Sequence, residues 1–337
     1  MNTTYIQTDQ DGFEFLLNKE TKTAEVIKYK EFFYSNEEDL SNVFIPLSIT
    51  HKNEEFIIQS IKNNSFKAAS INSIQFPPDS KILTIEKAFA FSTIHSISIP
   101  PSVTELKDGW CCNTPLLSKV TVMKNNKYYK NYEEDEKLIL GKSDITKDEY
   151  DVLIFASRDI KKVTIPPNIT TISSYAFSES SITYIHIPSH ITQICTGAFD
   201  RCEKLQQVDI PHDSNLTKIE KCVFQLISIK KIFIPDLITE IDVAAFFNCE
   251  KLKFVEFSPN SQLQTIQENA FHGSPIMSIN IPKHVIKINI SFFGCSISPV
   301  RIVEINENTD MKKIDLVLFD CIYLMVPFNL RHLVTIS

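Results

Sequence analysis

The chain has 337 residues, of which 43% are hydrophobic, and its formal net charge is −7. This length exceeds that of a usual single-core domain, so the chain either divides into domains or extends its core in one dimension by repetition. The composition gives no electrostatic reason to expect a nucleic-acid partner, its few glycines disfavour a nucleotide fold, and no apolar run reaches the ~18–20 residues that span a bilayer.

Residues 1–66 contain no repeat. Two runs of strand-forming residues, 13–17 and 23–29, flank the polar stretch 18–22, which predicts a β-hairpin. We expect this hairpin to cap the open edge of the array that follows, because an uncovered edge strand recruits other chains. Residues 44–46, Phe-Ile-Pro, resemble the end of a repeat strand and are interpreted as a vestigial unit. The first seven residues have neither the basic nor the apolar region of a signal peptide.

From about residue 67 the sequence repeats. The unit that begins at Ile182 is 23 residues long, because the next one begins at Leu205. Its pattern, over residues 182–202, is L-x-x-I-x-I-P-x-x-I-x-x-I-x-x-x-A-F-x-x-C, with Ile in the first position here. Eleven copies are identified by the last apolar residue of their predicted strands, at positions 76, 99, 122, 165, 187, 210, 234, 257, 281, 305 and 326.

The physics of one unit follows from its spacing. Val208 and Ile210 are two residues apart, so both face the same side of a short strand. Pro211 ends that strand because it has no N–H to donate. The next apolar pair predicts a second short inward segment, and Ala-Phe fits a tight turn with the ring inside. One such unit buries too little to fold alone, whereas stacked copies share a continuous core.

The segment 123–159 interrupts the repeats. It contains the acidic run 133–136, followed by the apolar runs 138–140 and 152–155. The favoured interpretation is a β-hairpin insert with a solvated, charged tip. The alternative is a binding loop, because long insertions in rigid scaffolds often carry function.

The repeats resemble the BspA-like, or Treponema-type, leucine-rich repeats of bacterial and protist surface proteins, and residues 187–202 are a close copy of that unit. The resemblance covers about 67–337 and implies surface display, adhesion or host-factor binding. Members of the family commonly carry an insert between repeat blocks. We therefore predict a mainly β fold with a non-repeat cap at 1–66. Residues 67–337 are expected to form a right-handed leucine-rich-repeat solenoid with one long parallel sheet, interrupted by the insert at 123–159.

Known catalytic signatures are not found in the sequence. There is no nucleophile elbow, phosphate-binding loop or dinucleotide fingerprint, and the carboxylates follow the repeat instead of converging. His190 and His284 share one repeat position but lie four units apart, roughly 19 Å, so they cannot share a metal ion. We expect no catalytic residues, no metal and no cofactor.

Candidate binding residues come from the outward positions of the strands, which alternate with the inward apolar ones. Phe233 and Phe254 occupy diagonal positions on neighbouring strands, where we expect their rings to touch. Exposed aromatics surrounded by polar groups are typical of an interface. The alternative is that these rings only cover the sheet or lie beneath loops. The candidate residues are Tyr184, His186, Asp209, Lys231, Phe233, Phe254 and Glu256.

Three functions follow as hypotheses. The first is a surface adhesin or antigen that binds a host protein or glycan, and the second is an intracellular protein-interaction scaffold that uses the same face. The third, a hydrolase with its site in the insert, has little support. In the first two cases we expect a monomer with a protein or glycan partner, no nucleic-acid partner and no insertion into a membrane.

The eight cysteines are too dilute for a disulfide scaffold. Cys202 and Cys249 occupy one repeat position two coils apart, roughly 9–10 Å, which exceeds the ~7 Å limit for a disulfide. Cys295 and Cys321 lie in adjacent coils and are the best candidates for a bridge. We nevertheless expect thiols throughout.

Overall fold

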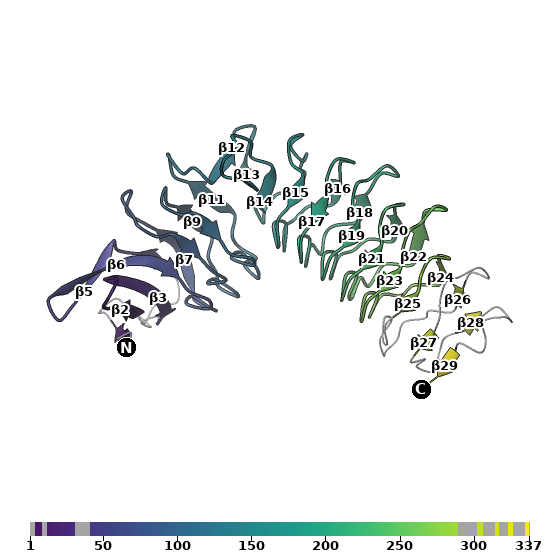
Figure 1. The fold of residues 1–337 in the computed structure, drawn as a ribbon, viewed down its shortest axis with the longest axis horizontal. Coiled ribbons are helices and arrows are strands. Elements are labelled where there is room, and N and C mark those ends of the chain that lie inside the picture. Colours follow the sequence, from purple (N-terminus) through teal and green to yellow (C-terminus); the bar gives the residue numbers. More distant parts are fainter. Residues whose placement is uncertain are drawn as a thin grey trace. The chain divides into compact units, whose positions relative to one another are not determined.

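The computed structural model describes residues 4–8, 12–30 and 41–288 and four short strands beyond them, at 302–305, 314–316, 323–325 and 334–336. The chain forms two compact units, residues 1–159 (unit 1) and 160–337 (unit 2). Within the described ranges the secondary structure consists of strands and turns, without a helix (Figure 1). The β-solenoid expected from the repeats is thus confirmed.

Unit 1 begins with the predicted hairpin. Strands β2 (Phe13–Asn18) and β3 (Thr23–Tyr29) pair antiparallel, and β1 (Thr4–Thr8) adds to β2. On its other side β3 pairs in parallel with β6 (Glu54–Ile61), which also pairs with β5 (Ser48–His51). The hairpin therefore pairs with the first strand of the ladder that β6 begins, and its role as a cap stays a prediction.

The repeats of unit 1 form two parallel ladders, one from each strand of the repeat (Figure 1). The first ladder consists of β4 (Ser41–Phe44), β7 (Ile71–Gln75), β9 (Ser96–Ile99) and β11 (Lys119–Val122). The second ladder continues from β3 and β6 into β8 (Thr84–Ile85) and β10 (Glu105–Leu106). Because β4 pairs in parallel with β7, residues 44–46 do continue the repeat toward the N-terminus.

The insert is an antiparallel meander of three strands, β12 (Tyr129–Tyr132), β13 (Asp135–Gly141) and β14 (Val152–Ala156). The predicted hairpin between the apolar runs is present as β13 and β14. The sequence analysis missed β12, which has only one buried residue, Tyr129, and therefore lacks the apolar signal of a strand. Glu133 and Glu134 form the exposed turn between β12 and β13.

Unit 2 repeats the two-ladder arrangement. Its first ladder consists of β16 (Tyr184–His186), β18 (Gln207–Asp209), β20 (Lys231–Ile234), β22 (Phe254–Phe257), β24 (Ser278–Ile281), β26 (Ile302–Ile305) and β28 (Tyr323–Met325). Its second ladder consists of β15 (Thr171–Ile172), β17 (Gln193–Ile194), β19 (Lys218–Ile219), β21 (Glu240–Ile241), β23 (Thr265–Ile266), β25 (Lys287–Ile288), β27 (Ile314–Leu316) and β29 (Val334–Ile336).

The expectation of one long parallel sheet needs correction. Each unit has two ladders, and in unit 2 both are divided: β16 and β18 form one sheet, and β20 to β28 form another. The second ladder likewise divides after β17 and after β25. The strands have only two to four residues, so each pairing depends on very few backbone hydrogen bonds and a small shift between coils interrupts it.

The core of unit 2 is a column of phenylalanine rings, one from each Ala-Phe turn or its equivalent. Phe177, Phe199, Phe224, Phe246 and Phe271 are fully buried. The centroids of successive rings are 5.0, 5.5, 5.5 and 5.2 Å apart, and their planes are within 20° of parallel. In unit 1, Phe66 and Phe89 are also in contact, with ring centroids 5.5 Å apart and planes tilted by 35°. The column makes the hydrophobic core continuous from one coil to the next.

The turn around each ring requires two residues with left-handed backbone, four positions apart. In unit 2 these pairs are Tyr175 and Glu179, Gly197 and Arg201, Cys222 and Leu226, Ala244 and Asn248, and Asn269 and Gly273. A left-handed residue other than glycine costs roughly 1–2 kcal/mol. A Cβ atom on Gly273 would lie 1.9 Å from Oδ1 of Asn248, so any other residue there would also displace the Asn248 side chain.

The cysteine at the end of the repeat pattern donates a hydrogen bond to a backbone carbonyl in the turn of the preceding coil. The thiols of Cys202 and Cys249 donate to the carbonyl oxygens of Phe177 and Phe224, at 2.9 and 3.0 Å. Ser274 makes the same contact to Phe246 at 2.8 Å. The six cysteines among the described residues are thiols, as expected, and burial raises the pKa of Cys249 to about 12. Cys295 and Cys321 lie outside the described residues.

Removing one ring from the column should destabilise the fold strongly. Phe224→Ala leaves a cavity between two stacked rings, so we expect a loss of about 3–5 kcal/mol in the free energy of unfolding. Phe91→Ala is the matched control, because Phe91 is 60% exposed and its loss should cost less than about 0.5 kcal/mol. Chemical denaturation of both variants measures the difference, and equal losses would contradict the role of the column.

Asp200 is a buried carboxyl group in one of these turns. Its side chain is only 6% exposed, and Oδ1 has no hydrogen-bond partner among the described residues. Burial raises the pKa of Asp200 to about 7, with Arg201 opposing the shift and Glu179 adding to it. The folded state therefore holds a proton that the unfolded chain releases near pH 4.

This buried carboxyl predicts a pH-dependent stability. The stability that protonated Asp200 contributes is fully present below pH 4 and is lost as the pH rises to about 7. Over this range the free energy of unfolding falls by at most about 1.4 kcal/mol per pH unit. Asp200→Asn should remove this decline and raise the melting temperature at pH 8, whereas the exposed Asp213→Asn should not. Melting curves of the three proteins between pH 4 and pH 8 test it; parallel curves would show that Asp200 does not titrate in this range.

Candidate binding face

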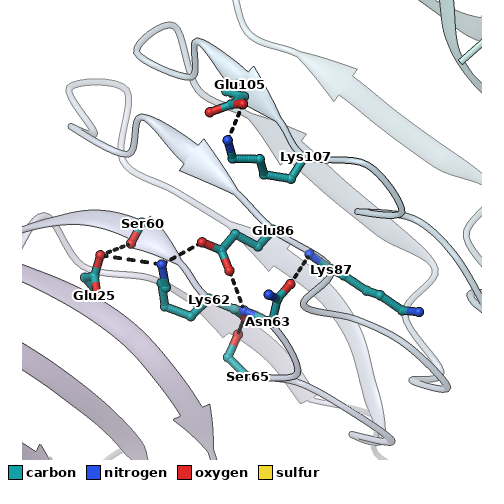
Figure 2. A network of polar contacts seen from close by, with 9 residues as sticks. All are labelled: Glu25, Ser60, Lys62, Asn63, Ser65, Glu86, Lys87, Glu105 and Lys107. Carbon is teal, nitrogen blue, oxygen red and sulfur yellow. Dashed lines mark hydrogen bonds and ion pairs between the residues drawn. The ribbon is translucent and has the colours of Figure 1, made fainter. Parts of the chain in front are cut away.

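Charged side chains on the outward face of the second ladder form ion pairs with one another. In unit 1, Nζ of Lys62 lies 2.6 Å from Glu86 and 3.8 Å from Glu25, and Ser60 donates to Glu25 at 3.1 Å (Figure 2). The hydrogen bond to Glu86 raises the pKa of Lys62. Glu105 and Lys107 form a further ion pair on the same ladder (Figure 2).

Figure 2 also shows how this network reaches the turns. The other carboxylate oxygen of Glu86 accepts from the backbone N–H of Asn63 at 3.0 Å, and Oδ1 of Asn63 accepts from the N–H of Lys87 at 3.1 Å. In unit 2, Lys218 is paired in the same way with Glu240 and Asp242, at 3.0 and 2.8 Å. The second ladder therefore uses several of its charged groups to connect coils.

The first ladder of unit 2 places the candidate residues on its outward face. Their neighbours Ile185, Val208, Ile232 and Val255 are buried, and the candidates alternate with them as the strand period predicts. Tyr184 and Phe254 are 44% and 48% exposed. The strand register pairs Tyr184 with Gln207, His186 with Asp209, Lys231 with Phe254, and Phe233 with Glu256.

Asp209 interacts with two other candidate residues, His186 and Tyr184. Nδ1 of His186 lies 2.7 Å from Oδ2 of Asp209, and both side chains are about half exposed. Partial desolvation, followed by the charge and hydrogen bond of Asp209, raises the pKa of Tyr184. A polar contact this exposed adds little to stability, on the order of 0–1 kcal/mol, so its main effect is to hold three polar groups in a fixed arrangement.

The expected contact between Phe233 and Phe254 is not among the ring contacts of the described residues. Phe233 is half-buried and packs against His212, with the ring centroids 4.2 Å apart and the planes at 55°. His212 follows Pro211 in the turn after β18, and its ring contacts the ring of Phe233 on the next coil. The sequence analysis missed His212 because it considered strand positions only. A signal was nevertheless present in the longer link from Ile210 to the next apolar pair.

The candidates therefore form a strip across four strands instead of one cluster. His186, Asp209 and Tyr184 lie at one end, on β16 and β18. Lys231, Phe254 and Glu256 lie at the other end, on β20 and β22, with Phe233 beside His212 in the middle. Tyr184 and Phe254 occupy the same column three strands apart, or roughly 14 Å. Such a strip can contact an extended partner at several points.

Neither a metal site nor a membrane-spanning helix is present among the residues that the structure describes. No group of three histidine, cysteine or acidic side chains there is arranged to hold a metal ion. In the same part of the chain, no helix is long and apolar enough to cross a membrane.

The repeats and the paired ladders define a leucine-rich-repeat protein. The sequence matches the family described as BspA type leucine rich repeat region, in six copies over residues 17–133, 152–253 and 217–325. Since these matches cover most of the chain, the protein belongs to this family. The curated proteins contain no match to it.

The chain is similar to several solved structures at low sequence identity. A leucine-rich repeat protein from Eubacterium ventriosum is 17% identical with a TM-score of 0.51, and the match covers 87% of this chain and 95% of the other. One from Bacteroides ovatus is 20% identical with a TM-score of 0.48, covering 92% and 71%. A leucine rich cell surface protein from Faecalibacterium prausnitzii is 20% identical with a TM-score of 0.45, covering 100% and 99%.

Proposed function

We propose that the protein is a non-catalytic binding protein that recognises a macromolecule, a protein or a glycan, through the outward face of the first ladder in unit 2. The observation that carries this proposal is the exposure of Tyr184 and Phe254 on a rigid sheet, with charged groups beside them. Aromatic side chains surrounded by polar residues have the composition of interface hot spots.

The contrast between the two ladders supports this choice of face. On the second ladder the ion pairs of Lys62 and Lys218 connect neighbouring coils. On the first ladder of unit 2, Phe254 lies between Lys231 and Ser278, and neither neighbour covers its ring. A sheet face that leaves a large apolar ring exposed loses stabilisation that burial would supply, which favours a role for that ring in binding.

The finer part of the proposal is that the protein is a surface adhesin or antigen whose partner is a host protein or glycan. Membership of the BspA-type repeat family supports it. The regular strip across β16, β18, β20 and β22 suits an extended ligand, because each coil presents one more pair of outward side chains at the same spacing.

Removing the two phenylalanines should abolish most of the binding and leave the fold intact. For Phe233→Ser combined with Phe254→Ser we expect affinity to fall by about 2 kcal/mol or more, or roughly thirtyfold in Kd. The measurement is binding of the labelled full-length protein to an array of purified extracellular proteins and glycans, followed by titration of the strongest hit.

Phe44→Ser is the matched control, because Phe44 is 54% exposed on the first ladder of unit 1. It should bind like the wild type. A double variant that melts at the wild-type temperature and still binds normally would refute the proposal. A double variant that unfolds would refute it equally, since the rings would then belong to the core.

A further inference from the structure

Four lysines gather where the first-ladder strands of unit 2 begin. Lys230 and Lys231 precede and open β20, and Lys251 and Lys253 lie just before β22. All four are exposed, and within the described part of the chain none of them forms an ion pair. This differs from Lys62 and Lys218, which have carboxylate partners on the second ladder.

Two of the lysines, Lys230 and Lys253, are in register on adjacent coils. The backbone N–H of Lys253 donates to the carbonyl of Lys230 at 2.9 Å, so the two residues occupy one column on adjacent coils. Lys231 lies directly opposite Phe254. Like charges opposite one another on neighbouring strands destabilise a sheet, and no carboxylate among the described residues forms an ion pair with Lys230 or Lys253. An anionic group bound along this column would relieve it.

Acidic side chains lie toward the other end of β22 and of β18, two strands away. Glu256 on β22 and Asp209 on β18 lie beyond the lysines, and Phe254 stands between the lysine column and Glu256. The strip is thus divided into a basic edge, an exposed ring and an acidic edge. A uniformly anionic chain laid across it would meet repulsion at the acidic edge and would gain nothing from Phe254.

We propose that the partner is an extended acidic peptide segment with apolar side chains. Its carboxylates lie along Lys230, Lys231 and Lys253, and an apolar side chain packs on Phe254. This inference rests on the proposed function and names the chemistry of its partner. Because exposed charges mainly steer association, binding should weaken as salt screens them.

A peptide library displayed on phage tests the proposal against full-length protein. Peptides of about 12 residues are long enough to cross several strands spaced about 4.8 Å apart. We expect the enriched peptides to be acidic with at least one large apolar residue. The best peptide and its analogue with Gln for every Glu and Asn for every Asp are then titrated by fluorescence anisotropy, with heparin as the sulfated-glycan probe.

Two sets of variants complete the test. Lys230→Gln, Lys231→Gln and Lys253→Gln together should weaken binding of the acidic peptide about tenfold at low salt, and the difference should shrink at high salt. The control carries Lys67→Gln, Lys81→Gln and Lys124→Gln, which removes the same charge from exposed positions of unit 1. It should bind the peptide as the wild type does.

The outcomes separate this inference from the proposed function. If neutral or basic peptides are enriched and their binding requires Phe254 but not the lysines, the face binds peptides and the acidic partner is wrong. Lysine-dependent binding of heparin that is tighter than that of any peptide would also overturn it. If no ligand is sensitive to Phe254 or to the lysines, the proposed binding face itself fails.

Discussion

The stacked phenylalanine column is the interaction on which the rest of the structure depends. Each ring, such as Phe224, is sandwiched between the rings of the coil before and the coil after it, at about the thickness of one coil. A single coil has no other way to bury so large a side chain, so coils are stable only in a stack. The left-handed residues on either side of each ring follow from this constraint, because the backbone must turn tightly around it.

Because the coils stack in one dimension, the protein has two ladders, and their outward faces have different roles. The second ladder connects coils through ion pairs such as Lys218 with Glu240, in addition to its backbone hydrogen bonds. The first ladder of unit 2 is already held by the buried residues Ile232 and Val255, so its outward positions need not contribute to stability. Those positions are therefore available for aromatic and charged residues that suit a ligand.

The repeat pattern predicted much of this arrangement, because a period-two strand fixes which side chains point inward. It placed Ile185 in the core and Tyr184 outside, and it identified Phe199 and Cys202 as parts of the turn. It did not predict the breaks in the ladders, since these depend on small shifts between coils. Nor did it predict that Phe233 packs on His212, because the path of the turn after Pro211 cannot be derived from strand periodicity.

The central claim is that one ladder stabilises the solenoid and the other receives the ligand. Hydrogen exchange of the full-length protein, with and without a saturating peptide selected from the library, tests it most directly. We expect added protection at the backbone amides of β20 and β22, with the amides of β19 and β21 unchanged. Protection confined to β19 and β21, or to the insert strands β12 to β14, would contradict this division between the ladders.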